Sequence, residues 1–202
     1  VIPAKGYGGG QRMMQMSGQH IETRILAGNI GLLTINDLMG TPEEIDKAML
    51  KLASTDGLLI DMRQCPGGDE NVVAQLMSYF IPEDDTIIEM HQRDHDVRLV
   101  KSRKLPTGAQ RYLDKPLTAV TSNFTGSGCE EISFDIKYHD LGYIHGENTA
   151  GAGFALQSEA ADIGYGLTVN IPDTAPKHPK YDFTFEKVGV APDFKESAPL
   201  AL

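Results

Sequence analysis

The pattern of apolar and polar residues becomes regular from His20. IETRILA (21–27) and GLLTIN (31–36) have the composition of two strands, and Gly28-Asn29 between them has the composition of a tight turn. The sequence therefore predicts two antiparallel strands at the start of the folded region, which we take to begin at residue 20.

The spacing then becomes helical. Thr41 is a candidate N-cap, Pro42 fits the first helical position, and Glu44 completes a capping box. The apolar residues that follow recur every three or four positions, at Ile45, Ala48, Met49 and Leu52.

Two later segments, GLLIDM (57–62) and LTAVTS (117–122), are apolar on both faces, which is typical of buried strands in a parallel sheet. Each runs into a glycine-bearing loop, RQCPGG (63–68) or NFTGSG (123–128), and each loop precedes a helix. Asp69 is expected to cap the first helix, whose inward residues are Val72, Val73, Leu76, Met77 and Phe80. The second helix is expected to bury Cys129, Ile132, Ser133 and Ile136.

Residues 86–101 have the pattern of a hairpin with a charged turn. Further strands, some of them antiparallel, are expected at YIHG, FALQSEA, YGLTVNI and FTFEKVG, which are residues 143–146, 154–160, 165–171 and 183–189. Alternating strands and helices with buried strands indicate an α/β domain with a mostly parallel sheet and flanking helices. We assign residues 20–202 to this core and residues 1–19, which are glycine-rich, to a flexible segment or one that leads into the domain. The tail at 196–202 is expected to be loose.

Composition narrows the classes of function. The chain has 202 residues, 41% of them hydrophobic, which suits one domain with a substantial core. Its formal net charge of −10 would repel phosphate backbones, so a nucleic-acid partner is not expected. No apolar run is long enough to span a bilayer. Two cysteines are too few for a disulfide framework, and their number does not indicate the cellular compartment of the protein.

Ser127 is the strongest candidate for chemistry. It lies between Gly126 and Gly128 at the start of a predicted helix, where peptide N–H groups are unpaired and the helix dipole favours negative charge. These amides would stabilise a developing oxyanion beside a serine nucleophile, and the glycines of the 63–68 loop would supply a second donor. The alternative is an ordinary serine N-cap.

Three blocks in order carry a resemblance to the C-terminal processing (tail-specific) serine peptidases. DMRQCPGG resembles their D-x-R-x-N-x-G-G motif, TSNFTGSGCEE…GENTAGAG resembles their T-S-x-x-x-x-S-x-x-E…G-E-x-T-x-G block, and FEKVGVAPDF resembles their closing segment. The resemblance implies a ClpP/crotonase-like fold and a catalytic serine at Ser127. It assigns the oxyanion donors to Gly128 and to either Gly67 or Gly68. No metal or organic cofactor is implied.

The sequence assigns the general base less directly than it assigns the nucleophile. One branch of the family uses a lysine in a T-x-G-K block, but the corresponding residue here is Ala152. The branch that resembles the tricorn core and the interphotoreceptor retinoid-binding protein uses a histidine oriented by a relay that ends in a glutamate, which Glu186 matches. The histidine of that branch lies in an upstream helical domain, so we expect the base on sequence outside this chain. His20 is the alternative within it, and an ordinary strand glutamate is the alternative for Glu186.

The resemblance implies a peptide or protein substrate, cleavage through an acyl-enzyme, and processing of C-termini. It favours a periplasmic or extracellular location, and a cytoplasmic location is the alternative. The resemblance does not indicate the oligomeric state. A non-catalytic ligand- or peptide-binding protein on the same scaffold is the alternative function, and an acyl-CoA enzyme of the crotonase type is a more distant one. His91 and His95 have a helical metal-ligand spacing but lie in the predicted hairpin, where a solvated turn is favoured over a metal site. Cys65 and Cys129 flank the two loops, and either a disulfide or a buried Cys129 fits the pattern.

Overall fold

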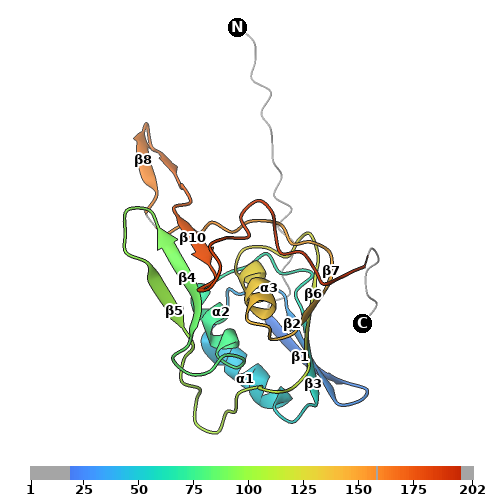
Figure 1. Ribbon diagram of the computed structural model, residues 1–202. Helices are drawn as coiled ribbons and strands as arrows, with labels where there is room; N and C mark the ends of the chain where they lie inside the picture. Colours follow the sequence, from blue (N-terminus) through green and yellow to red (C-terminus); the bar gives the residue numbers. More distant parts are fainter. Residues whose placement is uncertain (1–18, 158, 197–202) are drawn as a thin grey trace.

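A six-stranded sheet, ordered β1-β2-β3-β6-β7-β11, forms one layer of the computed structural model, which describes residues 19–157 and 159–196 (Figure 1). Its strands are β1 (Ile21–Leu26), β2 (Ile30–Ile35), β3 (Gly57–Asp61), β6 (Leu117–Thr121), β7 (Tyr143–Gly146) and β11 (Phe194–Lys195). Only the β1–β2 pair is antiparallel, and the other neighbours are parallel. The expected α/β domain with a mostly parallel sheet is therefore confirmed.

The turn between β1 and β2 lies where the sequence places it. Gly28 and Asn29 both have positive φ, at 76° and 58°. Two consecutive residues of this kind form the type of turn whose twist matches that of antiparallel strands, and glycine and asparagine are the residues that adopt it most readily. The turn fixes the register in which Ile21 pairs with Ile35.

Three helices lie between the large sheet and a smaller sheet (Figure 1). They are α1 (Pro42–Leu52), α2 (Glu70–Met77) and α3 (Gly128–Tyr138). Asp69 caps α2 as expected, accepting a 2.6 Å hydrogen bond from the Asn71 N–H. Thr41 occupies the N-cap of α1, but its side chain makes no capping hydrogen bond, so the predicted capping box is not formed.

The inward faces of the helices agree with the predicted pattern. All of the apolar residues expected to point inward are buried: Ile45, Ala48, Met49 and Leu52 on α1, Val72, Val73, Leu76, Met77 and Phe80 on or after α2, and Cys129, Ile132 and Ile136 on α3. Ser133 is buried as well, and its hydroxyl donates to the Cys129 carbonyl. The helix periodicity therefore locates the core correctly.

The smaller sheet has the order β10-β4-β5, with β4 (Thr86–Gln92), β5 (Arg98–Lys101) and β10 (Thr174–Lys177). The antiparallel β4–β5 pair confirms the hairpin predicted at 86–101. A separate hairpin of β8 (Ala161–Gly164) and β9 (Leu167–Val169) extends away from the rest of the domain (Figure 1).

Two predicted strands are wrong. In FALQSEA only Ala155 pairs in strand fashion, through an isolated bridge to Thr174, and FTFEKVG ends in a turn instead of a strand. The reason is local: the amides of Gly153 and Phe154 donate to the Glu186 carboxylate, so the side chain takes the place of a strand partner. Apart from Gln19 and Glu196, the segments 1–19 and 196–202 lie outside the described residues, and so does Ser158.

Candidate active site

The loops that follow β3 and β6 meet in space. A Cβ atom placed on Gly67 would lie 2.6 Å from the Cβ of Ser127 and 3.0 Å from the Gly128 nitrogen. Only glycine permits this approach, and its φ of 112° is one that other residues rarely adopt. The structure therefore brings together the two loops that the sequence singles out, at the carboxyl ends of neighbouring parallel strands.

Hydrogen bonds hold the two loops in register. The Gly126 N–H donates to the Cys65 carbonyl at 3.0 Å, and the Thr125 hydroxyl donates to the Met62 carbonyl at 2.9 Å. The Thr125 hydroxyl is fully buried, so leaving it unpaired would be costly. These contacts make the paired loops one rigid unit.

A disulfide adds a covalent link between them. Cys65, in the first loop, is bonded to Cys129, in the first turn of α3, with their Cα atoms 6.2 Å apart. Both side chains are buried. The sequence left two alternatives, and the structure contains the disulfide.

Ser127 adopts an unusual backbone conformation at the N-terminus of α3. Its φ of 49° and ψ of −121° lie outside the regions that non-glycine residues favour. The residue is exposed, and its side chain makes no capping hydrogen bond. Ser127 nevertheless occupies the N-cap position, and Glu130 accepts its N–H as the N3 residue of a capping box does. Strain of this kind is characteristic of functional sites.

Two residues with unpaired backbone amides border the same cavity. Gly68 and Gly128 line one cavity together with Ser127. Within residues 19–157 and 159–196, neither amide has a hydrogen-bond acceptor. The first amides of a helix lack a partner within the helix, which accounts for Gly128, while Gly68 is held by an isolated bridge to Leu38 that leaves its N–H unused. An anion beside Ser127 would find these two donors available.

Glu130 is the polar centre of the site, and the sequence analysis gave it no role of its own. Its fully buried carboxylate accepts hydrogen bonds from the Ser127 N–H at 2.9 Å and from the Thr149 hydroxyl at 2.6 Å. It also accepts from the amides of Gly151 and Ala152, at 2.6 and 2.8 Å. Glu130 thus fixes the turn at Ser127 against the segment 149–152. Its presence in the S-x-x-E block was the available signal.

Glu186 acts on the cavity through the backbone. Its Oε2 accepts hydrogen bonds from the amides of Gly153 and Phe154, each 2.9 Å long. Gly153 and Phe154 line the cavity, whereas Glu186 does not. The residue is partly buried at a turn, so the alternative of an ordinary strand glutamate is wrong.

No histidine among the described residues lines the cavity. His20 Nδ1 lies 2.6 Å from Oδ1 of Asp37, which is buried and follows β2 at the same end of the sheet. His91 pairs with Glu89 at 2.9 Å, and His95 lies in the exposed turn of the β4–β5 hairpin. Within the described part of the chain, no three His, Cys, Asp or Glu side chains are grouped as metal ligands would be.

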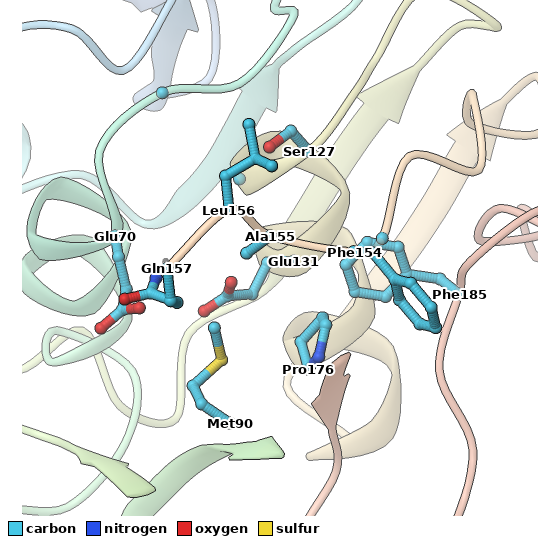
Figure 2. Close-up of a pocket in the computed structure, with 13 residues that line it drawn as sticks. Glu70, Met90, Ser127, Glu131, Phe154, Ala155, Leu156, Gln157, Pro176 and Phe185 are labelled. Atoms are coloured by element: carbon cyan, nitrogen blue, oxygen red, sulfur yellow. The ribbon is translucent and has the colours of Figure 1, made fainter. Parts of the chain in front are cut away.

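The cavity beside Ser127 has a volume of about 270 Å³ (Figure 2). Its walls come from the start of α2 and the loop before it, from β4, α3 and β10, and from the segment 153–157 and the segment after β10. They are formed by Gly68, Glu70, Met90, Ser127, Gly128, Glu131, Gly153, Phe154, Ala155, Leu156, Gln157, Pro176 and Phe185. A hydroxyl, two free amides and an adjoining cavity are the elements that nucleophilic attack on a carbonyl requires, apart from a base.

Comparisons with known proteins agree with this arrangement. A sequence profile of peptidase family S41 matches residues 29–196. The probable CtpA-like serine protease of Staphylococcus saprophyticus is 23% identical over 176 residues, which cover 85% of this chain and 34% of that protein. The carboxy-terminal processing protease CtpB of Bacillus subtilis is 24% identical over 153 residues, which cover 74% of this chain and 30% of that protein.

Among solved structures, the photosystem II D1 C-terminal processing protease has a similar fold, with a TM-score of 0.70 and 18% identity. The similarity covers 89% of this chain and 48% of that one. The chain spans about a third of the length of the curated relatives that it matches.

Proposed function

Because the chain belongs to peptidase family S41, we propose that it forms the core of a serine peptidase that cleaves peptide bonds through an acyl-enzyme and processes the C-termini of peptides or proteins. The observation that carries this proposal is the exposed Ser127 hydroxyl beside the free amides of Gly68 and Gly128. The family relationship and the names of the relatives support it.

In the proposed reaction Ser127 Oγ attacks the carbonyl carbon of the scissile bond and gives up its proton to a base. The Gly128 amide and the Gly68 amide donate to the resulting oxyanion. We choose Gly68 over Gly67 because Gly68 lines the cavity with Ser127. Collapse of the tetrahedral intermediate releases the amine, which takes up the proton, and water then hydrolyses the acyl ester.

The proposed base is a histidine outside the described residues. Ala152 stands at the position of the lysine that one branch of the family uses, and the only titratable side chains among the described residues that line the cavity are Glu70 and Glu131. His20, which is paired with Asp37, is the alternative base. Glu186 is proposed to position the 153–154 backbone and, through it, one wall of the cavity.

A fluorophosphonate probe tests the nucleophile in the full-length protein. We expect covalent labelling of Ser127, lost in Ser127→Ala and retained in Ser54→Ala, a change at an exposed serine after α1. Labelling that survives in His20→Gln supports a base elsewhere. If the folded protein is not labelled at Ser127, the peptidase proposal fails and the non-catalytic binding protein is favoured.

We also propose that the protein works in an oxidising compartment outside the cytoplasm. The Cys65–Cys129 disulfide supports this setting, since reducing compartments keep cysteine thiols in the reduced form. Among the described residues, no helix has the length and apolar character needed to cross a bilayer. Fractionation of cells that produce the protein, with detection by antibody, measures the location. Recovery of the protein only in the cytoplasmic fraction would contradict the proposal.

A further inference from the structure

One buried carboxyl oxygen at the cavity beside Ser127 has no hydrogen-bond partner. Glu131, on the first turns of α3, is only 6% exposed, and its Oε1 atom has no hydrogen bond. Glu131 lines the cavity, and Figure 2 shows its carboxylate extending into the space that Ser127 also borders. Burying an unpaired carboxylate is costly, so a protein tolerates it where a ligand supplies the missing partner.

The cation near Glu131, Arg98, forms its hydrogen bonds with another carboxylate, and its attraction does not offset the burial of Glu131. Glu70, on the same cavity wall, is neutralised by Arg98 through two hydrogen bonds of 2.7 and 2.8 Å. Asp135, one turn further along α3, is buried with both carboxylate oxygens unpaired. Because Asp135 does not line the cavity, Glu131 is the carboxylate that a ligand reaches.

The raised pKa of Glu131 is consistent with a pocket that would bind a cation. Burial and, to a smaller extent, the negative charge of Glu70 raise the pKa of Glu131 to about 8, while Arg98 opposes the shift. A cation that enters the cavity would favour the ionised form of Glu131 and lower its pKa.

The rest of the cavity is suited to an aliphatic stem. Its apolar surface comes from Met90, Phe154, Ala155, Leu156, Pro176 and Phe185. In Figure 2, Leu156 and Ala155 lie between Ser127 and Glu131, so a side chain that extends from Ser127 toward Glu131 would pass these two groups. Lysine and arginine combine such a stem with a cationic end.

Resting on the peptidase function proposed above, we propose that Glu131 is a specificity-determining residue that selects lysine or arginine at the residue whose carbonyl Ser127 attacks. The cavity adjoins both Ser127 and the amides of Gly68 and Gly128, so it receives the side chain next to the attacked carbonyl. A charge-assisted hydrogen bond to Glu131 gives this residue its preference.

Binding to the full-length Ser127→Ala protein tests the pocket without hydrolysis. The probes are short alanine-rich fluorescent peptides that carry one lysine, norleucine or glutamate, and fluorescence anisotropy gives their Kd. We expect lysine to bind at least about tenfold more tightly than norleucine and glutamate to bind most weakly. Glu131→Gln in the same background should abolish the lysine preference, whereas Glu22→Gln, on the exposed face of β1, should retain it. Thermal melting checks that each variant is folded.

The pH dependence of peptide binding is a second test. A purely structural role of Glu131 would not make the lysine preference depend on pH. The lysine preference should rise between pH 6 and pH 8 as Glu131, faced by Glu70, Arg98 and Asp135, ionises more readily. This rise should be absent in Glu131→Gln. Equal affinity for lysine and norleucine, or a lysine preference that survives in folded Glu131→Gln, overturns the inference.

The two proposals fail in different ways. Hydrolysis by the wild-type protein with equal rates after lysine and norleucine overturns the role of Glu131 and leaves the peptidase function standing. A Glu131-dependent lysine preference in Ser127→Ala, without any hydrolysis by the wild type, supports the pocket and overturns the peptidase function.

Discussion

The carboxylate of Glu130 accepts the N–H of Ser127 at 2.9 Å, so a buried acidic group holds the exposed serine in its strained conformation. The same carboxylate accepts three further hydrogen bonds from the segment 149–152. Four donors therefore converge on one side chain.

Glu130→Gln is expected to be among the most damaging conservative substitutions in the protein. A glutamine amide would direct N–H donors at the N–H groups that now donate to the carboxylate, and the loss should be on the order of 3 kcal/mol in free energy of unfolding. Urea denaturation measures it. Glu43→Gln, on the exposed side of α1, is the control and should leave the stability nearly unchanged. Equal stabilities of the two variants would show that Glu130 does not hold the site together.

Removing the disulfide should loosen the site before it unfolds the domain. The bond joins residues separated by 64 positions, and cross-linking a loop of this length contributes about 4 kcal/mol in the chain-entropy description. The double variant Cys65→Ala/Cys129→Ala should therefore melt at lower temperature but remain folded, since the Gly126 and Thr125 hydrogen bonds still join the loops. We expect a reduced rate of fluorophosphonate labelling. The comparison is with wild type treated with dithiothreitol, which should behave in the same way, and unchanged melting in both would contradict the expectation.

Gly68→Ala should disrupt the proposed oxyanion site directly. A Cβ at this position would lie 2.4 Å from the Leu38 carbonyl carbon, and φ is 150°, so the backbone has to move. We expect a loss of about 3 kcal/mol or more in stability together with loss of labelling at Ser127.

Gly108→Ala is the matched control for Gly68→Ala. It also has a positive φ, of 86°, but no atom lies within 4 Å of the added Cβ. It should cost only about 1 kcal/mol of backbone strain. Similar losses in the two variants would mean that strain alone, and not the contact with Leu38, explains the effect.

His178 should make the domain sensitive to acid. It is buried beside His139, with ring centroids 4.5 Å apart, and its Nδ1 accepts the Lys180 N–H. Burial lowers its pKa from 6.5 to about 4, with smaller contributions from His139 and Lys180. The unfolded chain therefore binds the proton more readily, and stability falls as the pH drops from about 6.5 to about 4, by on the order of 2 kcal/mol.

His178→Gln should flatten this part of the stability profile, measured by urea denaturation at several pH values. His95→Gln, at the exposed turn of the β4–β5 hairpin, should leave the slope unchanged. The remaining slope in His178→Gln would report His139, whose pKa is also lowered by burial. An unaltered slope in His178→Gln would exclude this histidine as the cause.

The sequence was informative where periodicity or turn chemistry dominates. The strands at 57–61 and 117–121, the Gly28-Asn29 turn and the loops around Gly67 and Ser127 all follow from local patterns. The conformation of the segments around residues 154 and 186 does not follow from such patterns. The amides of Gly153 and Phe154 donate to the Glu186 carboxylate and not to a neighbouring strand.

Glu131 could not be anticipated for a different reason. Helix α3 lies between two sheets and is buried on several sides, so Glu130, Glu131 and Asp135 are as inaccessible as its apolar residues. An amphipathic pattern predicts one buried face only. The pairing of Cys65 with Cys129 was equally undetermined, because it depends on a distance between positions that lie far apart in the sequence.

The two halves of the cavity have separate origins along the chain. The hydroxyl and free amides come from residues 68–128, whereas much of the apolar wall comes from residues 153–157. That wall is anchored to Glu186 by main-chain amides, which every amino acid except proline supplies equally. The side chains of Phe154, Leu156 and Gln157 can consequently be exchanged without removing this anchor, whereas Gly153 cannot, because a Cβ there would lie 2.7 Å from the Glu186 nitrogen.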